Sequence, residues 1–501
     1  MDDSDLLAAH RDEIEALTAS REFAPWIDGG HYSPETENSV RTVDPAVNHP
    51  IVSIRACNAE DVDSAVDAAW DAFDGTWSST APAERAAKIR EWADLLREHE
   101  SELARLECID TGKPISQARG EVRGAVDTLE YYAGICRSIE GDQITTGDDL
   151  HAYTRREPFG VVGQIIPWNF PLWSFAWKVG PALAAGNATV LKPAVDAPLT
   201  PLRAAQLSAE TFPDGVINVV PGTGSEAGSA LTDHDGVRKV SFTGSRDVGE
   251  LVMKSAAANV APVTLELGSK SPFVVFPDAD VEKVGQAVAD GIYYSSGEIC
   301  DAFSRAIVHE DVYEPFVDEF LGATEGYTVG DPLSEETTLG PLTTDEQYES
   351  VREYIEIGKE EEATLLRGGS APPSGFEDGW YVEPTVFSDV DNGMKIAREE
   401  IFGPVQTIQT FSSYEEGIDL ANDTRFGLSA GIGTEDLSLA HSAAADLQAG
   451  IVYVNDYGPI RPEAPYGGFK ESGIGNDLGK ESLDHYLQTK SVYMNLEEPT
   501  L

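Results

Sequence analysis

The sequence predicts an α/β fold, and three observations lead to that prediction. Short apolar runs alternate with helical patterns between residues 161 and 257, and a second alternation of this kind runs from residue 273 to about residue 455. Such a β-α-β rhythm predicts parallel sheets covered by helices, the usual cradle for a nucleotide. The third observation is length. The chain has 501 residues, of which 41% are apolar, so we expect two or more domains rather than one core.

The individual elements follow from the spacing of apolar residues. Ahead of the first rhythm, helical spacing predicts helices at 2–18, 59–77, 83–100 and 120–139. The first rhythm predicts strands at 161–166, 189–191, 217–220 and 239–242, and helices at 173–185, 201–210, 226–231 and 248–257. The second begins with strands at 273–276 and 306–309 and helices at 284–294 and 312–320. Two segments lie outside both rhythms: a polar, β-like stretch at 142–156 and an isolated strand at 489–495.

The chain is strongly acidic, with a formal net charge of −52 that is spread along its whole length. Nucleic-acid binding needs a basic face, so this charge excludes that class of function. A surface with such self-repulsion is costly at low ionic strength and tolerable under strong screening. We therefore expect a halophilic protein from a salt-rich cytoplasm.

Other features of the chain bear on its compartment. No apolar run approaches the roughly 20 residues that a membrane helix needs, and the acidic start Met1-Asp2-Asp3-Ser4-Asp5 lacks the basic and apolar regions of a signal peptide. The four cysteines are too scattered to form a disulfide framework. We therefore expect a cytoplasmic protein that binds neither membrane nor nucleic acid, and we identify no metal site.

Three polar residues indicate a chemistry. Cys300 follows the turn Ser295-Ser296-Gly297-Glu298-Ile299, Asn169 lies between two prolines, and Glu266 lies between two leucines. A thiol nucleophile, an amide donor for an oxyanion and a carboxylate that activates water are what oxidation of an aldehyde through a thioester requires. Each residue alone has a plainer interpretation: a small buried side chain, a turn residue and an exposed strand-end carboxylate. The plainer interpretation holds for the cysteines that have no polar constellation nearby, Cys57, Cys108 and Cys136.

A series of segments in the same order resembles the aldehyde dehydrogenase superfamily over nearly the whole chain. They are Ile166-Pro-Trp-Asn-Phe-Pro171, Leu191-Lys-Pro193, Phe242-Thr-Gly-Ser245, Leu265-Glu-Leu-Gly268, Gly297-Glu-Ile-Cys300, Glu399-Glu-Ile-Phe-Gly-Pro404 and Gly467-Gly-Phe-Lys-Glu-Ser-Gly473. The resemblance implies a Rossmann-like cofactor domain, an α/β catalytic domain and a small β extension for oligomerisation. These map to 1–138 with 157–265, to 266–460, and to 139–156 with 486–501. It also implies a homodimer or homotetramer.

The resemblance assigns catalytic roles. Cys300 is the nucleophile, and we expect its surroundings to lower the pKa of its thiol. Asn169 and the Cys300 backbone N–H hold the oxyanion, and Glu266, with a raised pKa, activates the water that releases the acid. Lys178 and Asp477 resemble a proton-relay pair, although the family usually has Glu in the second place, so we expect a water to bridge them. Glu266 favours hydrolysis over transfer of the acyl group to coenzyme A.

The resemblance further implies a nicotinamide dinucleotide, which accepts the hydride. The backbone N–H groups at the start of the helix after Gly244-Ser245 could hold the pyrophosphate. Val195 stands where relatives often carry an acid that repels a 2′-phosphate, so NAD and NADP both stay open. The full set of expected cofactor residues is Ile165, Ile166, Trp168, Lys192, Val195, Gly222, Gly228, Phe242, Gly244, Ser245, Gly268, Glu400 and Phe402.

The substrate positions are largely aromatic. The resemblance places five residues along the aldehyde tunnel: Phe170, Trp177, Tyr294, Asp301 and Tyr466. Aromatic boxes at these places hold quaternary ammonium groups in betaine-aldehyde and aminoaldehyde dehydrogenases by cation–π attraction. The plainer alternative is an apolar tunnel for a general aliphatic aldehyde or semialdehyde, with Arg461 as the candidate for binding a carboxylate. Two further alternatives are a coenzyme A-acylating enzyme and a non-catalytic structural homologue.

Overall fold

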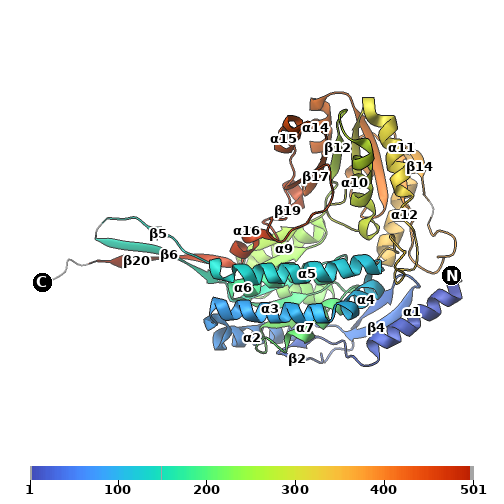
Figure 1. Cartoon of the computed structure of the whole chain (residues 1–501). Coiled ribbons are helices and arrows are strands. Elements are labelled where there is room, and N and C mark those ends of the chain that lie inside the picture. Colours follow the sequence, from blue (N-terminus) through green and yellow to red (C-terminus); the bar gives the residue numbers. More distant parts are fainter. Residues whose placement is uncertain (1–2, 148, 370, 497–501) are drawn as a thin grey trace.

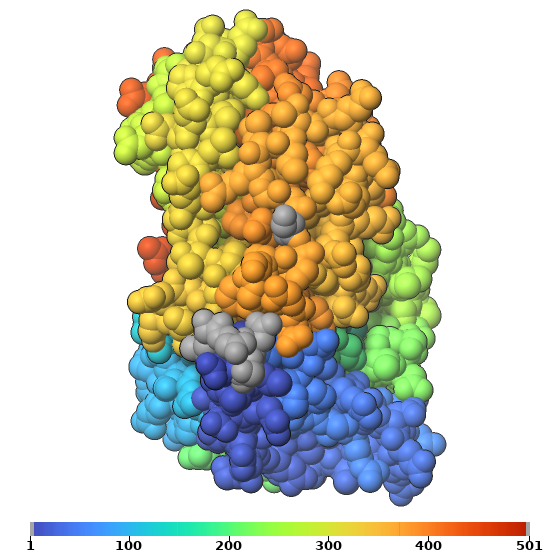
Figure 2. Space-filling view, turned by 90° about the vertical axis from the view of Figure 1, so that its right-hand side faces the viewer, coloured from blue at the N-terminus to red at the C-terminus, as the bar shows by residue number. Residues whose placement is uncertain are grey.

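The computed structural model describes residues 3–147, 149–369 and 371–496. Two bodies lie against each other, each built around its own sheet, and a narrow arm projects from one of them (Figure 1). The space-filling view shows the N-terminal body, in blue and green, below the second body, in yellow and orange (Figure 2). The predicted α/β fold is confirmed. Of the predicted ranges, residues 1–2, 148, 370 and 497–501 lie outside the described residues.

The first sheet has, within the described residues, the strand order β19-β11-β10-β7-β8-β9-β1-β2. Its central strands are parallel, and they are β7 (Val161–Ile165), β8 (Ala188–Lys192), β9 (Ile217–Val219), β10 (Lys239–Thr243) and β11 (Val263–Glu266). Antiparallel strands close its edges: β1 (Trp26–Ile27), β2 (Gly30–His31) and β19 (Gly473–Ile474). Because the central strands run parallel, their carboxyl ends meet at one edge, where ligands bind in open α/β sheets.

The helices of the first body largely match the predicted ones. They are α1 (Asp3–Thr18), α2 (Ala59–Gly75), α3 (Pro82–Glu98), α4 (Glu100–Thr111), α5 (Ile115–Ile135), α6 (Pro171–Ala185), α7 (Leu199–Ser208), α8 (Ser229–Asp233) and α9 (Arg246–Ala258). The prediction missed α4. Its last residues, 106–111, are all buried, Glu107 and Asp110 included, so no polar face marks it in the sequence. The helix predicted at 226–231 is interrupted, because 224–228 forms a π-helical turn before α8.

The second sheet has the order β14-β15-β16-β13-β12-β17-β18 within the described residues. Its strands are β12 (Pro272–Val275), β13 (Arg305–His309), β14 (Thr364–Arg367), β15 (Thr385–Ser388), β16 (Val405–Phe411), β17 (Ser429–Gly433) and β18 (Ile451–Val454). The accompanying helices are α10 (Val281–Tyr293), α11 (Tyr313–Thr324), α12 (Asp345–Glu360), α13 (Lys395–Arg398), α14 (Tyr414–Asn422) and α15 (Leu437–Asp446). The chain then returns to the first body through β19 and α16 (Gly479–His485).

The arm corrects one prediction. The strand expected to be isolated, at 489–495, forms β20 (Leu487–Asn495) and pairs antiparallel along β6 (Leu150–Pro158). Strand β5 (Gln143–Ile144) flanks β6 on its other side, so β6 is central rather than an open edge. Figure 1 shows the three strands extending away from the rest of the chain. A separate hairpin joins β3 (Ser39–Asp44) and β4 (His49–Arg55).

No helix within the described residues combines the length and the apolar character that crossing a bilayer demands.

Candidate active site

A cleft of about 730 Å³ opens between the two bodies. The first body contributes the segments that follow β7, β10 and β11, and the second contributes the segment between α10 and β13 together with loops near 400 and 457–466. Many of the sequence-predicted site residues line it: Trp168, Asn169, Phe170, Trp177, Gly244, Ser245, Glu266, Gly268, Tyr294, Cys300, Asp301, Glu400, Phe402 and Tyr466.

Cys300 follows a strained turn. Ser295 and Ser296 have φ of 48° and 54°, a region that L residues rarely adopt. The Ser295 N–H donates to the Gln117 Oε1 (3.0 Å) and the Ser296 hydroxyl to the Gly340 carbonyl (2.9 Å), which holds the turn in place. The Cys300 Sγ lies 3.0 Å from the Tyr466 hydroxyl.

The electrostatics at Cys300 contradict the sequence expectation. Burial is the main cause that raises the pKa of the thiol, and the neighbouring charge of Asp301 adds to it. The hydrogen bond with Tyr466 opposes the rise without overcoming it. The expected lowering of this pKa is therefore wrong. An acidic residue beside a desolvated thiol disfavours the thiolate.

Asn169 projects from the loop after β7. Its side-chain Nδ2 donates to the backbone carbonyl of Glu298, two residues before Cys300, at 2.8 Å. An amide nitrogen carries two hydrogens, so one N–H is left to point at a ligand in the cleft. Asn169 is 6% exposed, which places this donor in a poorly solvated site.

Glu266 ends β11, and its carboxyl group is buried at the base of the cleft. Neither carboxyl oxygen makes a hydrogen bond within the described residues. Burial, followed by the negative charge of Asp477, raises the pKa of Glu266 well above its usual range, while Lys178 opposes the rise. Gly467 leaves space for this carboxyl group, since a Cβ at residue 467 would lie 3.1 Å from the Glu266 Oε1.

Lys178 and Asp477 lie behind Glu266 rather than in the cleft wall. The Lys178 Nζ donates directly to the Asp477 Oδ2 at 2.8 Å and also to the Ser241 Oγ at 3.0 Å. The expected bridging water is not needed. The shorter side chain of Asp477 reaches Lys178 because residue 477 pairs with Tyr466 through backbone hydrogen bonds, which brings its backbone close.

One half of the cleft combines a helix start with a partly buried carboxyl group. Ser245 caps α9, its Oγ accepting from the Val248 N–H at 3.4 Å, so free N–H groups face the space beside Gly244. The Glu400 Oε1 accepts from the Ser269 N–H at 2.8 Å, and burial raises the pKa of Glu400 to about 7. A Cβ at Gly268 would lie 2.0 Å from the Glu400 carboxyl, so that position has no room for a side chain.

The turn that carries Glu400 is held by Gln347, a residue that the sequence analysis did not predict for the site. The Gln347 Nε2 donates to the carbonyls of Ile401 and Phe402, whose own φ of 58° is strained. The Phe402 ring meets Trp168 edge-on, with ring centroids 5.5 Å apart. Gln347 lies on α12, far away in sequence, and nothing in its local pattern indicated this role.

The remaining predicted cofactor residues do not line the cleft. Lys192, at the end of β8, donates to the carbonyls of Pro193 (2.7 Å) and Gly222 (3.1 Å), and burial lowers its pKa to about 8. A Cβ at Gly228 would meet the Lys192 side chain at 3.6 Å. The others lie in or beside the same sheet, with Val195 half-buried against the first core: Ile165, Ile166, Val195, Gly222 and Phe242.

Aromatic rings wall the end of the cleft near Cys300. The rings of Trp177 and Tyr466 lie 4.9 Å apart, and those of Phe170 and Tyr294 are stacked at 6.5 Å. Sequence reasoning missed the partners of Asp301: the Tyr453 hydroxyl donates to its Oδ2 (3.0 Å) and the Tyr457 hydroxyl to its Oδ1 (3.2 Å).

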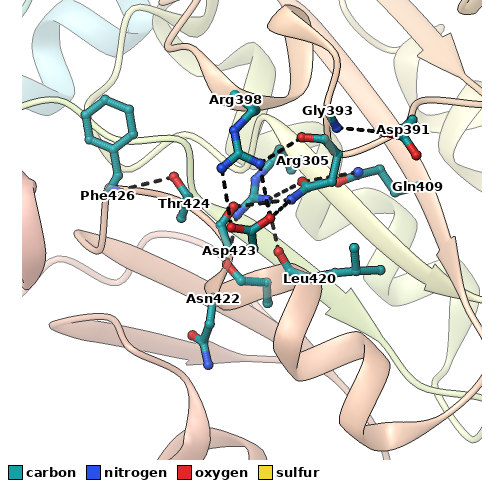
Figure 3. Close-up of polar contacts among 12 residues, drawn as sticks. Arg305, Asp391, Gly393, Arg398, Gln409, Leu420, Asn422, Asp423, Thr424 and Phe426 are labelled. Carbon is teal, nitrogen blue, oxygen red and sulfur yellow. Dashed lines mark hydrogen bonds and ion pairs between the residues drawn. The ribbon is translucent and has the colours of Figure 1, made fainter.

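A buried arginine supports the second body's side of the cleft from behind. Arg305, at the start of β13, donates to the carbonyls of Lys270 (3.0 Å), Leu420 (3.2 Å) and Ala421 (2.9 Å). Figure 3 shows Arg305 and Arg398 beside Asp423. Arg305 ends the loop that carries Cys300 and Arg398 precedes Glu400, so this cluster fixes the two loops relative to each other.

Comparisons with known proteins agree with this site. Residues 31–492 match the model of the aldehyde dehydrogenase family. Aldehyde dehydrogenase 1 of Tanacetum cinerariifolium is 45% identical over 93% of this chain and 94% of that protein. An NAD+ complex of the aldehyde dehydrogenase of Bacillus cereus is 43% identical, covers 97% of this chain and 99% of that one, and superposes with a TM-score of 0.94. The betaine aldehyde dehydrogenase of Staphylococcus aureus with NAD+ is 36% identical, covers 98% of each chain and has a TM-score of 0.95.

The fold and the site therefore define an oxidoreductase, and the chain belongs to the aldehyde dehydrogenase family. It is an NAD(P)-dependent enzyme that oxidises aldehydes. The donor set of the cleft fits such a cofactor. It pairs a helix start with a partly buried carboxyl group that, among the described residues, accepts from one backbone N–H, and the cofactor would accept the hydride there.

Proposed function

We propose that Cys300 attacks the aldehyde carbon and that Asn169 and the Cys300 backbone N–H stabilise the oxyanion. After the hydride has left, water activated by Glu266 releases the carboxylic acid, with Lys178 and Asp477 moving the proton away. The placement of Cys300, Asn169 and Glu266 around one cleft supports these roles. The raised pKa of Glu266 makes it a stronger base than an exposed carboxylate, which suits this step.

Burst kinetics test this division of labour. Glu266→Gln should still release a burst of reduced cofactor and then turn over very slowly, because only hydrolysis of the thioacyl enzyme is lost. Cys300→Ala should abolish both phases. Absence of a burst in Glu266→Gln with normal cofactor binding would show that the carboxyl group acts earlier. A requirement for coenzyme A in turnover would favour the acylating alternative.

We further propose that the substrate carries a positive charge, as betaine aldehyde or an aminoaldehyde does. Asp301 carries this proposal. It is buried, it lines the cleft next to Cys300, and among the described residues its carboxylate is held by tyrosine hydroxyls and by no cation within ion-pair distance. Burial raises its pKa only to about 6, so it is mostly ionised at neutral pH. A buried carboxylate without a countercharge is costly, and a cationic ligand would supply the charge.

The same charge connects the substrate to the nucleophile. Asp301 contributes to the raised pKa of the Cys300 thiol. A cation bound beside Asp301 would cancel that field and favour the thiolate. Rings of Trp177, Tyr457 and Tyr466 border the same space and would add cation–π attraction of roughly 0.5–2 kcal/mol each. Arg461, the candidate for a semialdehyde carboxylate, is exposed and does not line the cleft, which disfavours that alternative.

A matched pair of aldehydes tests the charge alone. Betaine aldehyde and 3,3-dimethylbutanal have nearly the same shape, and only the first is cationic. With concentrations corrected for hydration, kcat/KM should favour the cation by about tenfold or more, and Asp301→Asn should remove most of that preference. Equal values for both aldehydes in the unmodified enzyme would instead support a general aliphatic dehydrogenase.

The remaining expectations are proposals about context. We propose that the β5-β6-β20 arm, which projects from the body and exposes Tyr493, mediates assembly into a homodimer or homotetramer.

We propose the cofactor domain at 1–138 with 157–265, the catalytic domain at 266–460 and the oligomerisation strands at 139–156 with 486–501. The charge of −52 supports a halophilic, cytoplasmic enzyme, and unchanged stability on dialysis to millimolar salt would contradict it. Val195 is half-buried and carries no charge, so it does not exclude either NAD or NADP. Activity assays with each cofactor in turn would decide between the two.

A further inference from the structure

A buried lysine lies beside Asn169 without lining the cleft. Helix α4 ends at Gly112, whose φ of 76° turns the chain sharply, and a Cβ at this glycine would lie within 2.7 Å of Pro45 and Pro341. The turn carries Lys113 inward, and only 3% of the residue stays exposed. The segment also touches the second body, since the Thr343 hydroxyl donates to the Thr111 carbonyl at 2.9 Å.

The ammonium group of Lys113 has three partners. It forms an ion pair with the buried Glu121 of α5. It donates to the backbone carbonyl of Asn169 at 2.6 Å, and it lies 4.1 Å from the centroid of the Phe170 ring. Buried charges persist in proteins only where such partners compensate their desolvation. The face of Phe170 that Lys113 covers is therefore closed to a substrate cation.

These contacts fix Asn169 at two points. Lys113 holds its backbone carbonyl, and the Glu298 carbonyl holds one hydrogen of its side-chain amide. Glu298 is itself fixed, because its carboxyl group accepts from the N–H (3.0 Å) and the hydroxyl (2.9 Å) of Thr343. Because both of these points are fixed, the second hydrogen of the Asn169 side-chain amide is directed into the cleft.

We infer that Lys113, paired with Glu121, is a positioning residue that aims the Asn169 amide at the oxyanion. The inference rests on the proposed role of Asn169. An oxyanion donor must lie 2.7–3.1 Å from the developing charge, and a misplacement of about 1 Å can cost roughly a hundredfold in rate. A group that fixes the donor from behind therefore controls the acylation step without touching the substrate.

Buried carboxyl groups surround Lys113 and its partner Glu121. Glu121 and Glu298 face Lys113, and Glu107 lies beside Glu121. Burial raises the pKa of Glu121 well above its usual range and that of Glu298 to about 8. Glu107 accepts a hydrogen bond from the Thr200 hydroxyl at 2.6 Å.

The test separates the rate of acylation from the amount of competent enzyme. Lys113→Met keeps an unbranched side chain that is one atom shorter, and it removes the charge and the hydrogen bonds. We expect the rate constant of the reduced-cofactor burst to fall about tenfold to a hundredfold, with burst amplitude and cofactor affinity nearly unchanged. A purely structural role would lower the amplitude and leave the rate constant alone, which would overturn the inference. Lys113→Arg, which keeps the charge, should recover part of the rate.

A double variant decides whether Lys113 acts through Asn169. In an Asn169→Ala background the substitution Lys113→Met should have little further effect on the burst rate constant, because the positioned donor is already gone. An undiminished effect in that background would overturn the inference. If Asn169→Ala alone left the burst rate constant unchanged, the proposed role of Asn169 would fail. If Asn169→Ala slowed the burst and Lys113→Met did not, only the role of Lys113 would fail.

Discussion

Two buried lysines lie behind the cleft, and they differ in what lies beyond them. Lys178 is behind Glu266, the proposed base, and Lys113 is behind Asn169, the proposed oxyanion donor. Each is paired with one carboxylate, Asp477 and Glu121 respectively. Beyond its carboxyl partner, Lys178 continues into a chain of hydroxyl groups, whereas the other partners of Lys113 are a carbonyl and a ring. We therefore propose that the same residue type serves proton movement at Lys178 and geometry at Lys113.

The chain behind Lys178 can be followed atom by atom. Its Nζ donates to the Ser241 Oγ, the Thr264 hydroxyl donates to that Oγ at 2.9 Å, and the Lys239 Nζ donates to the Thr264 Oγ1 at 3.3 Å. Burial, followed by the charge of Lys178, lowers the pKa of Lys239 to about 7. Near neutrality Lys239 therefore exchanges protons readily, which a relay requires.

The largest expected effect comes from breaking the relay at its carboxylate. Asp477→Asn keeps the shape of the side chain and removes the charge that pairs with Lys178. We expect steady-state kcat to fall roughly a hundredfold while the burst of reduced cofactor keeps its rate constant. Stopped-flow measurement of both phases checks this. A slower burst would show that the pair of Lys178 and Asp477 also affects acylation, the step that we assign to Lys113.

A smaller effect is expected farther along the chain. Thr264→Val removes one hydroxyl from the relay and keeps the volume of the side chain, and we expect kcat to fall about tenfold with the burst intact. Thr324→Val is the matched control, because Thr324 is fully buried but its hydroxyl donates only to the Leu321 carbonyl, away from the cleft. Equal kcat values for the two variants would show that proton transfer from Glu266 does not use this chain.

The sequence predicted one half of this arrangement better than the other. Asn169 and Glu266 follow parallel strands, so their meeting at one sheet edge could be foreseen, and the motifs added Cys300 from the second body. Lys113 and Gln347 could not be foreseen, because they act across contacts between segments far apart in the chain. The raised pKa of Cys300 had a visible signal in its neighbour Asp301, but burial, its largest cause, becomes apparent only in the folded chain.

A pH dependence separates the substrate charge from both lysines. The pKa of Asp301 is raised to about 6, so its negative charge is present above that pH and is lost below it. We expect KM for betaine aldehyde to rise several-fold as the pH falls from 7 to 5, and KM for 3,3-dimethylbutanal to stay nearly constant, since the neutral aldehyde gains nothing from the charge. If KM changed with pH in the same way for both aldehydes, the charge of Asp301 would have no part in substrate recognition.

The smallest expected effect on catalysis is at another buried cation, His10, which serves as a reference for a purely structural role. Its Nδ1 lies 2.6 Å from the Asp44 carboxylate and its Nε2 lies 3.0 Å from Asp331, so it joins α1 and β3 to the second body. Burial opposes its charge, but the hydrogen bonds and charges of Asp331 and Asp44 outweigh it and raise the pKa of His10 to about 9.

A raised folded-state pKa stabilises the fold fully below the unfolded value of 6.5, and this contribution disappears as the pH passes through about 9. His10→Gln should therefore lower the free energy of unfolding by about 3 kcal/mol at pH 6.5 and by much less at pH 9.5. Urea unfolding at both pH values measures the difference, and kcat of the folded enzyme should not change. A pH-independent loss of stability would mean that packing rather than charge holds His10. A loss of kcat would mean that coupling to the active site is not confined to the two lysines beside the cleft.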